Sequence, residues 1–341
     1  MAFAAFGNPP PGLIVNTTTL TPYKFSISND QVTQLTDLLR ATSSLSSFAT
    51  PSYFNTHTNP TSLNGTLGVS LDWLVKATEV WTNEFDWRKV EGRLNRVPNF
   101  VATVTVSSSN SSSSPSTPTA GGTPSSNTTA TASGTTASNS TKSESKSEGK
   151  SKSEGKREHK VHFAALFSHR QDAVPLLLLH GWPGAWFEFL PVMERLAQRY
   201  TPETLPFHVV VPSLPGFGIS SSPPEKEMTF AEAAAVVDAL MTQLGMGDGY
   251  VVQGGDVGSL VAMVLGGSMP ACKAVHVNMV ATNPAWMEVV AGLEVTPEEA
   301  VRLARMQEFV KSGRAYQVIQ GERPATVGFA VMSSPVAMLA W

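Results

Sequence analysis

The segment Tyr250-Val-Val-Gln-Gly-Gly-Asp-Val-Gly-Ser259 decides the fold of this chain, because it predicts a strand, a tight turn and a helix in direct succession. Its first half is apolar, which is typical of a buried strand, and an apolar helix is predicted from Leu260 to Gly266. A sharp strand-to-helix turn needs small residues on both sides of its apex, because a Cβ atom there would crowd the strained backbone. Gly254 and Gly258 flank Asp256 in this way. We therefore expect Asp256 at the apex, above the sheet and at the start of the helix.

The residue type at this apex indicates the chemistry. In hydrolases built on such a turn, the apex residue is the nucleophile. A serine hydroxyl attacks a carbonyl carbon, whereas a carboxylate attacks an alkyl carbon and forms an ester. Asp256 therefore points to opening of an epoxide ring or displacement of a halide.

Strands and helices alternate around this segment. The run at 174–180 is continuously apolar, as is typical of a strand buried on both faces of a parallel sheet. The alternation predicts a doubly wound α/β sheet. Its strands are predicted at 161–168, 174–180, 207–213, 249–253 and 274–279, and its helices at 186–198, 229–244 and after residue 256.

The remainder of the chain divides into three further blocks. Residues 22–106 carry helical patterns, with Ser28 and Ser70 as predicted N-caps, and are expected to form a helical meander. Residues 107–160 are almost wholly Ser, Thr, Ala, Gly, Asn and Pro and then a Lys/Ser/Glu repeat, so they are predicted to be a disordered linker. The α/β core is expected at 161–284 and a lid at 285–341.

The composition excludes several classes of partner. The net charge is −3 and basic residues cluster only in the low-complexity tract, so we expect no nucleic-acid partner. A single cysteine, Cys272, excludes a disulfide framework and is expected to be a small buried residue. The first residues lack a basic and apolar leader, and no stretch is long and apolar enough to span a membrane. We expect a soluble cytoplasmic protein that needs neither a metal nor a cofactor; the oligomeric state is left open.

A second turn motif, His180-Gly-Trp-Pro-Gly184, closes the second predicted core strand. Open α/β sheets place their ligands at the carboxyl ends of strands, and a turn there frees backbone N–H groups. We expect the N–H groups of Trp182 and Val257 to form an oxyanion hole. The other residues expected to shape the pocket are His180, Gly181, Pro183, Gly184 and Gly255.

Taken together, the motifs resemble the microsomal-type epoxide hydrolases of the α/β-hydrolase fold. The similarity is carried by Phe85-Asp-Trp-Arg-Lys89 and 93–100 before the linker, by 177–184, 211–218 and 254–259 in the core, and by 312–317, 323–328 and 334–341 in the lid. The resemblance implies an α/β-hydrolase sheet and a reaction of a small epoxide with water that gives a vicinal diol.

The resemblance also implies roles for two residues. Asp256 corresponds to the nucleophile. Tyr316 corresponds to a lid tyrosine that gives a proton to the epoxide oxygen. We expect Tyr316 on the lid helix whose start is marked by Thr296, Pro297 and Glu299.

This sequence departs from the family pattern in two places. Val257 stands where the family usually has tryptophan. The family's partner tyrosine, charge-relay acid and general-base histidine follow the lid, after the position of Trp341. Because His276 lies inside a predicted strand, we expect it to be a buried core residue and not a base.

The end of the sequence leads to a further expectation. The last residues, 336–341, form an apolar run without a helix-stop signal, so the chain is expected to be truncated and turnover doubtful. Two other functions are left open: a haloalkane dehalogenase, and a catalytically inactive protein that binds ligands in its pocket.

Overall fold

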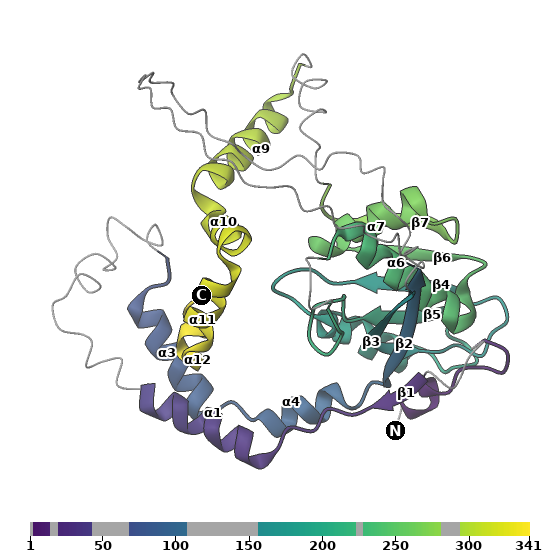
Figure 1. Ribbon diagram of the computed structural model, residues 1–341, viewed down its shortest axis with the longest axis horizontal. Helices are drawn as coiled ribbons and strands as arrows, with labels where there is room; N and C mark the ends of the chain where they lie inside the picture. Colours follow the sequence, from purple (N-terminus) through teal and green to yellow (C-terminus); the bar gives the residue numbers. More distant parts are fainter. Residues whose placement is uncertain (1–2, 14–19, 43–67, 108–155, 223–227, 281–293) are drawn as a thin grey trace, which may run out of the picture. The chain divides into compact units, whose positions relative to one another are not determined.

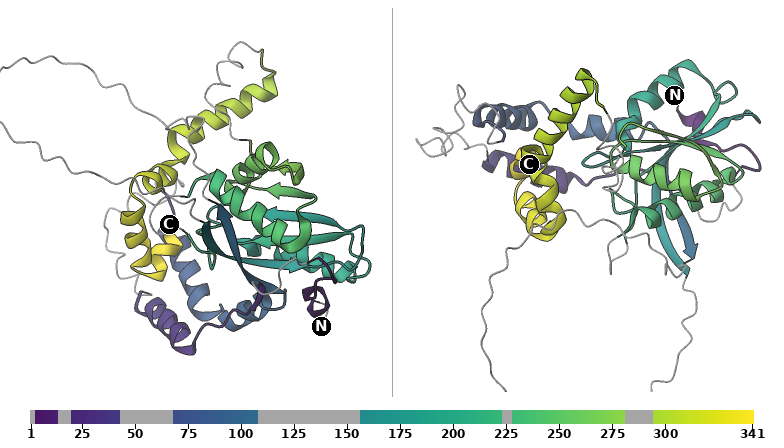
Figure 2. Two further views of the ribbon diagram at one scale, coloured as in Figure 1. Left: turned by 45° about the vertical axis from the view of Figure 1, so that its right-hand side comes forward. Right: turned by 90° about the horizontal axis from the view of Figure 1, so that it is seen from above.

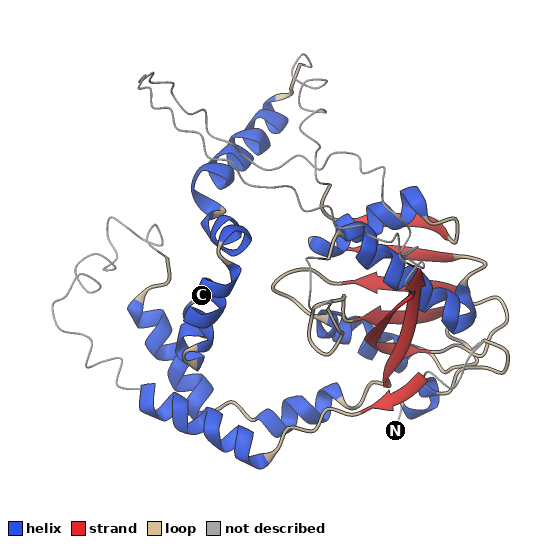
Figure 3. Cartoon of the chain, in the orientation of Figure 1, coloured by secondary structure: helices blue, strands red, loops and turns tan. Residues whose placement is uncertain are grey.

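The structure, a computed structural model, describes residues 3–13, 20–42, 68–107, 156–222, 228–280 and 294–341 (Figure 1). The chain divides into two compact units. Unit 1 consists of Met1–Tyr23 and Val97–Gly292, and unit 2 of Lys24–Arg96 and Leu293–Trp341. Figure 3 shows that unit 1 contains the strands and that unit 2 is helical. Each unit is therefore built from two stretches of sequence that are far apart.

In the described part of unit 1, seven strands form one sheet in the order β1-β2-β3-β5-β4-β6-β7. Strands β5, β4, β6 and β7 are parallel, whereas β1, β2, β3 and β5 are joined in antiparallel pairs. The predicted α/β class is therefore confirmed, with an antiparallel extension on one side. The strands are β1 (Leu20–Tyr23), β2 (Asn99–Ser107), β3 (Lys156–Leu166), β4 (Val174–Leu179), β5 (Phe207–Pro212), β6 (Tyr250–Gly254) and β7 (Cys272–Val277).

The five strands predicted in the core are confirmed to within a few residues. Their apolar runs form the centre of unit 1, where Leu177, Leu179 and Val210 are fully buried. Helix α6 contacts β2, and α7 contacts β6 and β7, so both helices cover the sheet (Figure 2). The helical elements of unit 1 are η1 (Ala4–Gly7), η4 (Trp186–Phe189), α5 (Leu190–Arg199), α6 (Phe230–Met241), η5 (Thr242–Met246) and α7 (Val257–Ser268).

Two strands were not predicted from the sequence. The block 22–106 was expected to be a helical meander throughout, but β2 occupies its end and belongs to the sheet of unit 1. Strand β1 begins just before that block. The predicted linker 107–160 is also wrong at its ends, because Ser107 closes β2 and residues 156–160 open β3. The rest of that linker, 108–155, lies outside the described residues.

Strands β2 and β3 are antiparallel neighbours along their whole length. Their register runs from Asn99 opposite Ala164 to Ser107 opposite Lys156. Ser107 and Lys156, which flank the segment 108–155, are therefore paired with each other.

The position of β4 creates the site at the carboxyl ends of the strands. The chain leaves β4 for β5 on one side and later returns to β6 on the other side. Such a point, where successive connections diverge, opens a crevice at the carboxyl ends of the two central strands in open α/β sheets. The turn after β4 and the turn after β6 both lie there.

Unit 2 is an assembly of helices from both ends of the chain. Helix α12 packs against α1 and α3, which precede it by more than two hundred residues. The predicted caps are confirmed: the Ser70 side chain accepts from the Trp73 N–H, and Thr296 and Glu299 form a capping box. Its elements are α1 (Asn29–Thr42), α3 (Leu71–Asn83), α4 (Trp87–Leu94), α9 (Pro297–Glu308), η6 (Phe309–Gly313), α10 (Ala315–Glu322), α11 (Pro324–Met332) and α12 (Pro335–Ala340).

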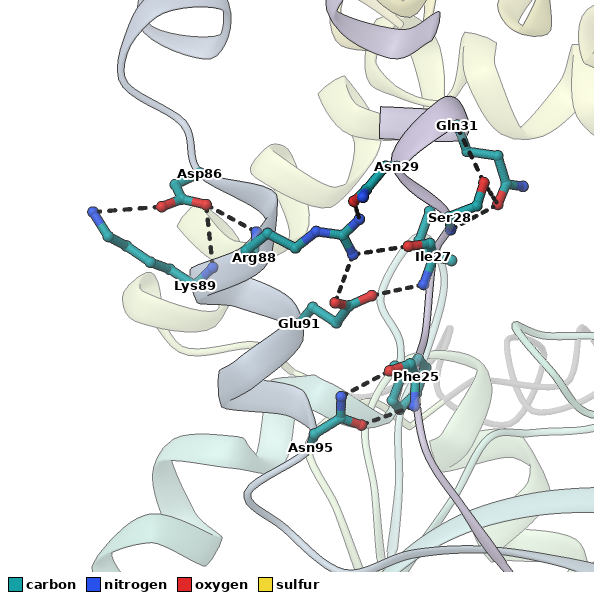
Figure 4. A network of polar contacts seen from close by, with 10 residues as sticks. All are labelled: Phe25, Ile27, Ser28, Asn29, Gln31, Asp86, Arg88, Lys89, Glu91 and Asn95. Carbon is teal, nitrogen blue, oxygen red and sulfur yellow. Dashed lines mark hydrogen bonds and ion pairs between the residues drawn. The ribbon is translucent and has the colours of Figure 1, made fainter. Parts of the chain in front are cut away.

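The extended residues that lead into α1 are tied to α4 by side chains (Figure 4). The Ile27 N–H donates to Glu91 Oε1 at 2.7 Å. The Asn95 side chain both accepts from the Phe25 N–H and donates to its carbonyl oxygen, each at 2.8 Å. The Arg88 guanidinium donates to the Ile27 carbonyl and to Glu91. These bonds fix the start of α1 against α4.

Within the described residues, no helix has the length and apolar character that crossing a membrane requires. In the same residues, no group of three or more His, Cys, Asp or Glu side chains is arranged to hold a metal ion.

Candidate active site

Asp256 stands at a strained apex between β6 and α7. Its φ of 50° and ψ of −121° make it the one non-glycine residue with positive φ in the described part of the chain. The flanking glycines are required by close backbone packing. A Cβ on Gly258 would overlap the carbonyl oxygens of Leu179 and His180, and one on Gly254 would overlap Gly258. The predicted turn is confirmed, and it leaves the Asp256 side chain exposed.

The register between β4 and β6 brings the second turn to Asp256. Leu179 pairs with Gly254, so the residues that follow each strand meet. A Cβ on Gly181 would lie 2.7 Å from Asp256 Oδ1, which leaves room there for glycine only. The Trp182 N–H donates to Asp256 Oδ1 at 2.8 Å. The structure thus brings together Asp256 and one of the two predicted oxyanion donors.

The second predicted donor, the Val257 N–H, is the first of helix α7. The first N–H groups of a helix have no partner within the helix and carry its partial positive charge. The remaining turn residues have backbone roles. The Gly255 N–H donates to the Leu179 carbonyl at 3.2 Å, and the Trp182–Pro183 peptide bond is cis.

His180 is buried and holds the turn in place. The Leu214 N–H donates to Nε2 at 3.0 Å, so Nε2 carries no proton and Nδ1 donates to the Gly181 carbonyl oxygen at 3.1 Å. Burial lowers the pKa of His180. This ring is therefore neutral and engaged on both sides, which gives it a structural role and leaves no nitrogen for activating water.

The other histidines lie in different surroundings. The expectation that His276 is a buried core residue is wrong: it is exposed in β7, opposite Gln253. Strand β7 is the last strand in the described sheet and is covered on neither face as fully as the central strands. His162 and His208 are buried and hydrogen-bonded inside unit 1, and His57 lies outside the described residues.

A second carboxylate that the sequence reading missed lies beside the turn. Glu188, in η4, places its carboxylate against Gly184, where a Cβ would overlap it. Burial raises the pKa of Glu188, and the negative charge of Asp256 raises it further. Glu188 follows Gly184 by four positions, and this spacing is the sequence pattern that could have indicated the contact. It was overlooked because Glu188 fits the polar face of the helix predicted at 186–198.

Tyr316 belongs to unit 2 and lies on α10, with 39% of its surface exposed. The expectation that it lies on the helix capped by Thr296 is wrong. That helix, α9, ends at Glu308 and passes into the turn η6. Arg314, with φ −99° and ψ 15°, leaves the helical conformation and separates η6 from α10.

The comparisons with known proteins place these features in a family. Residues 20–116 and 140–189 match the family described as epoxide hydrolase N terminus, and residues 174–297 match the alpha/beta hydrolase fold. The structure of the Aspergillus niger epoxide hydrolase is similar over 99% of this chain and 71% of its own, with 36% sequence identity and a TM-score of 0.72. The chain belongs to the epoxide hydrolase family. The resemblance seen in the sequence motifs is thereby confirmed.

Other members of the epoxide hydrolase family are similar over parts of their length. A putative epoxide hydrolase of Dothistroma septosporum is 35% identical over 324 residues, which are 94% of this chain and 63% of that protein. The chain thus spans a little under two thirds of the length of this relative. The crystal structure of the juvenile hormone epoxide hydrolase from Bombyx mori, at 22% identity and a TM-score of 0.66, supports the fold alone.

Proposed function

We propose that this chain opens epoxides through a covalent ester on Asp256. The observation that carries the proposal is the contact between the Trp182 N–H and Asp256 Oδ1, at a strained strand-to-helix apex. One carboxylate oxygen is held by this donor, so the other oxygen is oriented for attack. Preorganisation of this kind is what a nucleophile requires.

In the first step, a carboxylate oxygen of Asp256 attacks one carbon of the epoxide ring. The ring C–O bond breaks, the ester forms, and the negative charge moves to the epoxide oxygen. Tyr316 donates its hydroxyl proton to this oxygen, a role that rests on the family resemblance. A proton donor is needed because an alkoxide is a poor leaving group.

In the second step, water attacks the ester carbonyl carbon of Asp256. The oxyanion then forms on the carboxyl oxygen of the enzyme itself. The Trp182 N–H already points to that oxygen, and the Val257 N–H at the start of α7 is the second donor. Donors aimed at the developing charge stabilise the transition state by about 3 kcal/mol each. Collapse of the intermediate breaks the ester C–O bond, releases the diol and restores the carboxylate. One proton of the attacking water goes to the diol oxygen, and the other returns through solvent to the Tyr316 phenolate.

The proposal includes a specific expectation for this chain. His180 is engaged on both nitrogens, and we assign no other histidine of this sequence to the activation of water. An epoxide that reacts with Asp256 should therefore remain attached as the ester. We expect the described residues to hydrolyse this ester slowly, so that the adduct on Asp256 accumulates.

Intact-protein mass spectrometry after incubation with styrene oxide tests this expectation. The unsubstituted chain should gain the mass of one epoxide, and peptide mapping should place it on Asp256. Asp256→Ala should gain none, whereas Asp248→Ala, which removes an exposed carboxylate elsewhere in unit 1, should react like the unsubstituted chain.

Diol production beyond one equivalent would support the two-step reaction and show that a base is present, against the expectation that the adduct accumulates. Two other outcomes would contradict the proposal. Chloride release from a short haloalkane without reaction of the epoxide would identify a dehalogenase. Binding of styrene oxide without any adduct would identify an inactive pocket-binding protein.

A further inference from the structure

Two glycines of the turn after β4 each make room for a carboxylate. At Gly181 the missing Cβ would meet the Asp256 side chain, and at Gly184 it would meet the Glu188 carboxylate. The backbone of residues 181–184 is thus bordered by two acids from different elements. Both acids are exposed at the carboxyl ends of the central strands.

Glu188 is held in this position by a short, well-anchored helix. Element η4 starts at the buried Trp186, whose ring packs against His162 with centroids 5.4 Å apart. The Glu188 N–H donates to the Ala185 carbonyl oxygen at 2.9 Å, which closes the turn of η4. Because Trp186 faces the interior, Glu188, two residues later, is directed back to the turn and its glycine.

The two acids influence each other through their charge. The Asp256 carboxylate contributes to the raised pKa of Glu188, after the larger effect of burial. In the described part of the chain, no lysine or arginine forms an ion pair with Glu188. Among the described residues, the charge of Glu188 is therefore not neutralised by an ion pair with lysine or arginine.

We propose that Glu188 is a positioning residue that acts through Asp256, by destabilising the ionised nucleophile and thereby speeding the alkylation step. The inference rests on the proposed function, because it requires Asp256 to attack an epoxide. During that attack the negative charge leaves Asp256 for the epoxide oxygen. Repulsion between the two carboxylates is strongest before the attack and is relieved as the ester forms. Only interactions that differ between ground state and transition state change the rate, and this repulsion is one of them.

The step after alkylation is affected in the opposite direction. When water attacks the ester, negative charge returns to the carboxyl group of Asp256. Glu188 opposes that charge, so it should not assist ester hydrolysis. A Glu188 that accelerated hydrolysis would be a general base, which is a different role and would overturn the inference.

The experiment compares alkylation rates at mildly alkaline pH. The full chain is mixed with styrene oxide, and the adduct is followed with time by intact mass. Glu188→Gln keeps the shape of the side chain and removes its charge, and we expect adduct formation about tenfold slower. Glu188→Asp keeps the charge and should recover most of the rate.

Two comparisons separate the charge from a structural role. Glu203→Gln removes a charge from the exposed loop before β5, at the other end of the strands, and should react at the unsubstituted rate. Added salt screens repulsion between charges, so it should slow the unsubstituted chain and leave Glu188→Gln unchanged. Melting temperatures show whether each variant is folded. If Glu188→Gln melts early, the alkylation rates of Glu188→Asp and Glu188→Ala are compared instead, and a charge effect requires Glu188→Asp to react faster.

The outcomes distinguish this inference from the proposed function. If the unsubstituted chain forms the adduct on Asp256 and Glu188→Gln reacts equally fast, the inference fails and the proposed function stands. If the unsubstituted chain turns over and Glu188→Gln accumulates adduct, Glu188 is a base. If no adduct forms on the unsubstituted chain, the proposed function fails, and the inference fails with it.

Discussion

At the scale of single residues, Asp256 shows how a reactive group is presented by strain. A non-glycine residue at φ 50° and ψ −121° costs about 1–3 kcal/mol, and such a conformation persists only where its surroundings enforce it. Here the enforcement comes from glycines that allow the backbones of two turns to touch. The packing of the central strands offsets this cost. The result is a carboxylate in which Oδ1 already accepts a hydrogen bond from the Trp182 N–H.

His162 leads to a prediction about pH at the same scale. Its ring is fully buried; Nδ1 lies 2.9 Å from Ser213 Oγ and Nε2 lies 3.2 Å from Asn99 Oδ1. Burial lowers the pKa of His162 to about 4. In the unfolded chain a histidine has a pKa of about 6.5, so between these values the unfolded state binds a proton that the folded state does not.

The free energy of unfolding should therefore fall as the pH is lowered from about 6.5 to about 4, by roughly 3 kcal/mol from His162 alone. The contribution is fully present above the unfolded value and is lost below the folded value. Urea unfolding of the chain and of His162→Gln across this range checks it. The variant should show a smaller slope that is not zero, because burial also lowers the pKa of His159, His180 and His208. Equal slopes would assign the effect to those three residues.

At the scale of elements, helix α7 offers a matched pair of glycines. Gly258 lies in its first turn against the backbone of β4, whereas a Cβ on Gly267, near its end, would meet nothing within 4 Å. Gly258→Ala should destabilise the protein by about 1–3 kcal/mol because backbone atoms cannot rotate away. Gly267→Ala should stabilise it by up to about 1 kcal/mol, as alanine favours a helix. Thermal melts of the two variants test the pair, and similar shifts in both would refute the packing argument.

The elements also show what the sequence could predict. Strand β6, its turn and α7 are specified locally, by an apolar run and by glycines around Asp256, so they were predicted correctly. Strand β2 has a local signal in its alternating β-branched residues. Its partner β3 lies beyond 108–155, so the pairing could not be deduced from neighbours in sequence. Glu188 fits the polar face of the predicted helix 186–198, and the local pattern does not reveal that it lies against the turn after β4.

At the scale of the whole molecule, both units are assembled from distant parts of the sequence. Unit 2 requires residues 24–96 and 293–341 together, and its helix α12 contacts α1 and α3. Contacts between residues so far apart in sequence form slowly, because the chain entropy of closing the loop opposes them. In the sheet of unit 1, β1 and β2 are likewise paired although they are far apart in sequence.

The topology of β2 and β3 predicts the effect of shortening the segment between them. Replacing 108–155 with a short Gly/Ser turn should leave the fold intact and raise stability slightly, by about 0.6 kcal/mol for each halving of loop length. Melting temperature and the rate of adduct formation on Asp256 measure the effect. A clear decrease in the melting temperature or in the rate would mean that the Lys/Ser/Glu repeat contacts the folded protein. As a control, a deletion that also removes 156–160 should unfold the protein, because those residues belong to β3.

The pairing of Ser107 with Lys156 has a further consequence for how the molecule can be handled. A polypeptide that stops soon after β2 and another that starts just before β3 carry complementary edges of the same sheet. Each alone exposes an unpaired strand, which invites association with any available edge. Supplied together, the two pieces present each other with the correct edge. We therefore expect them to reassemble, and alkylation of Asp256 would then report that the two halves have met.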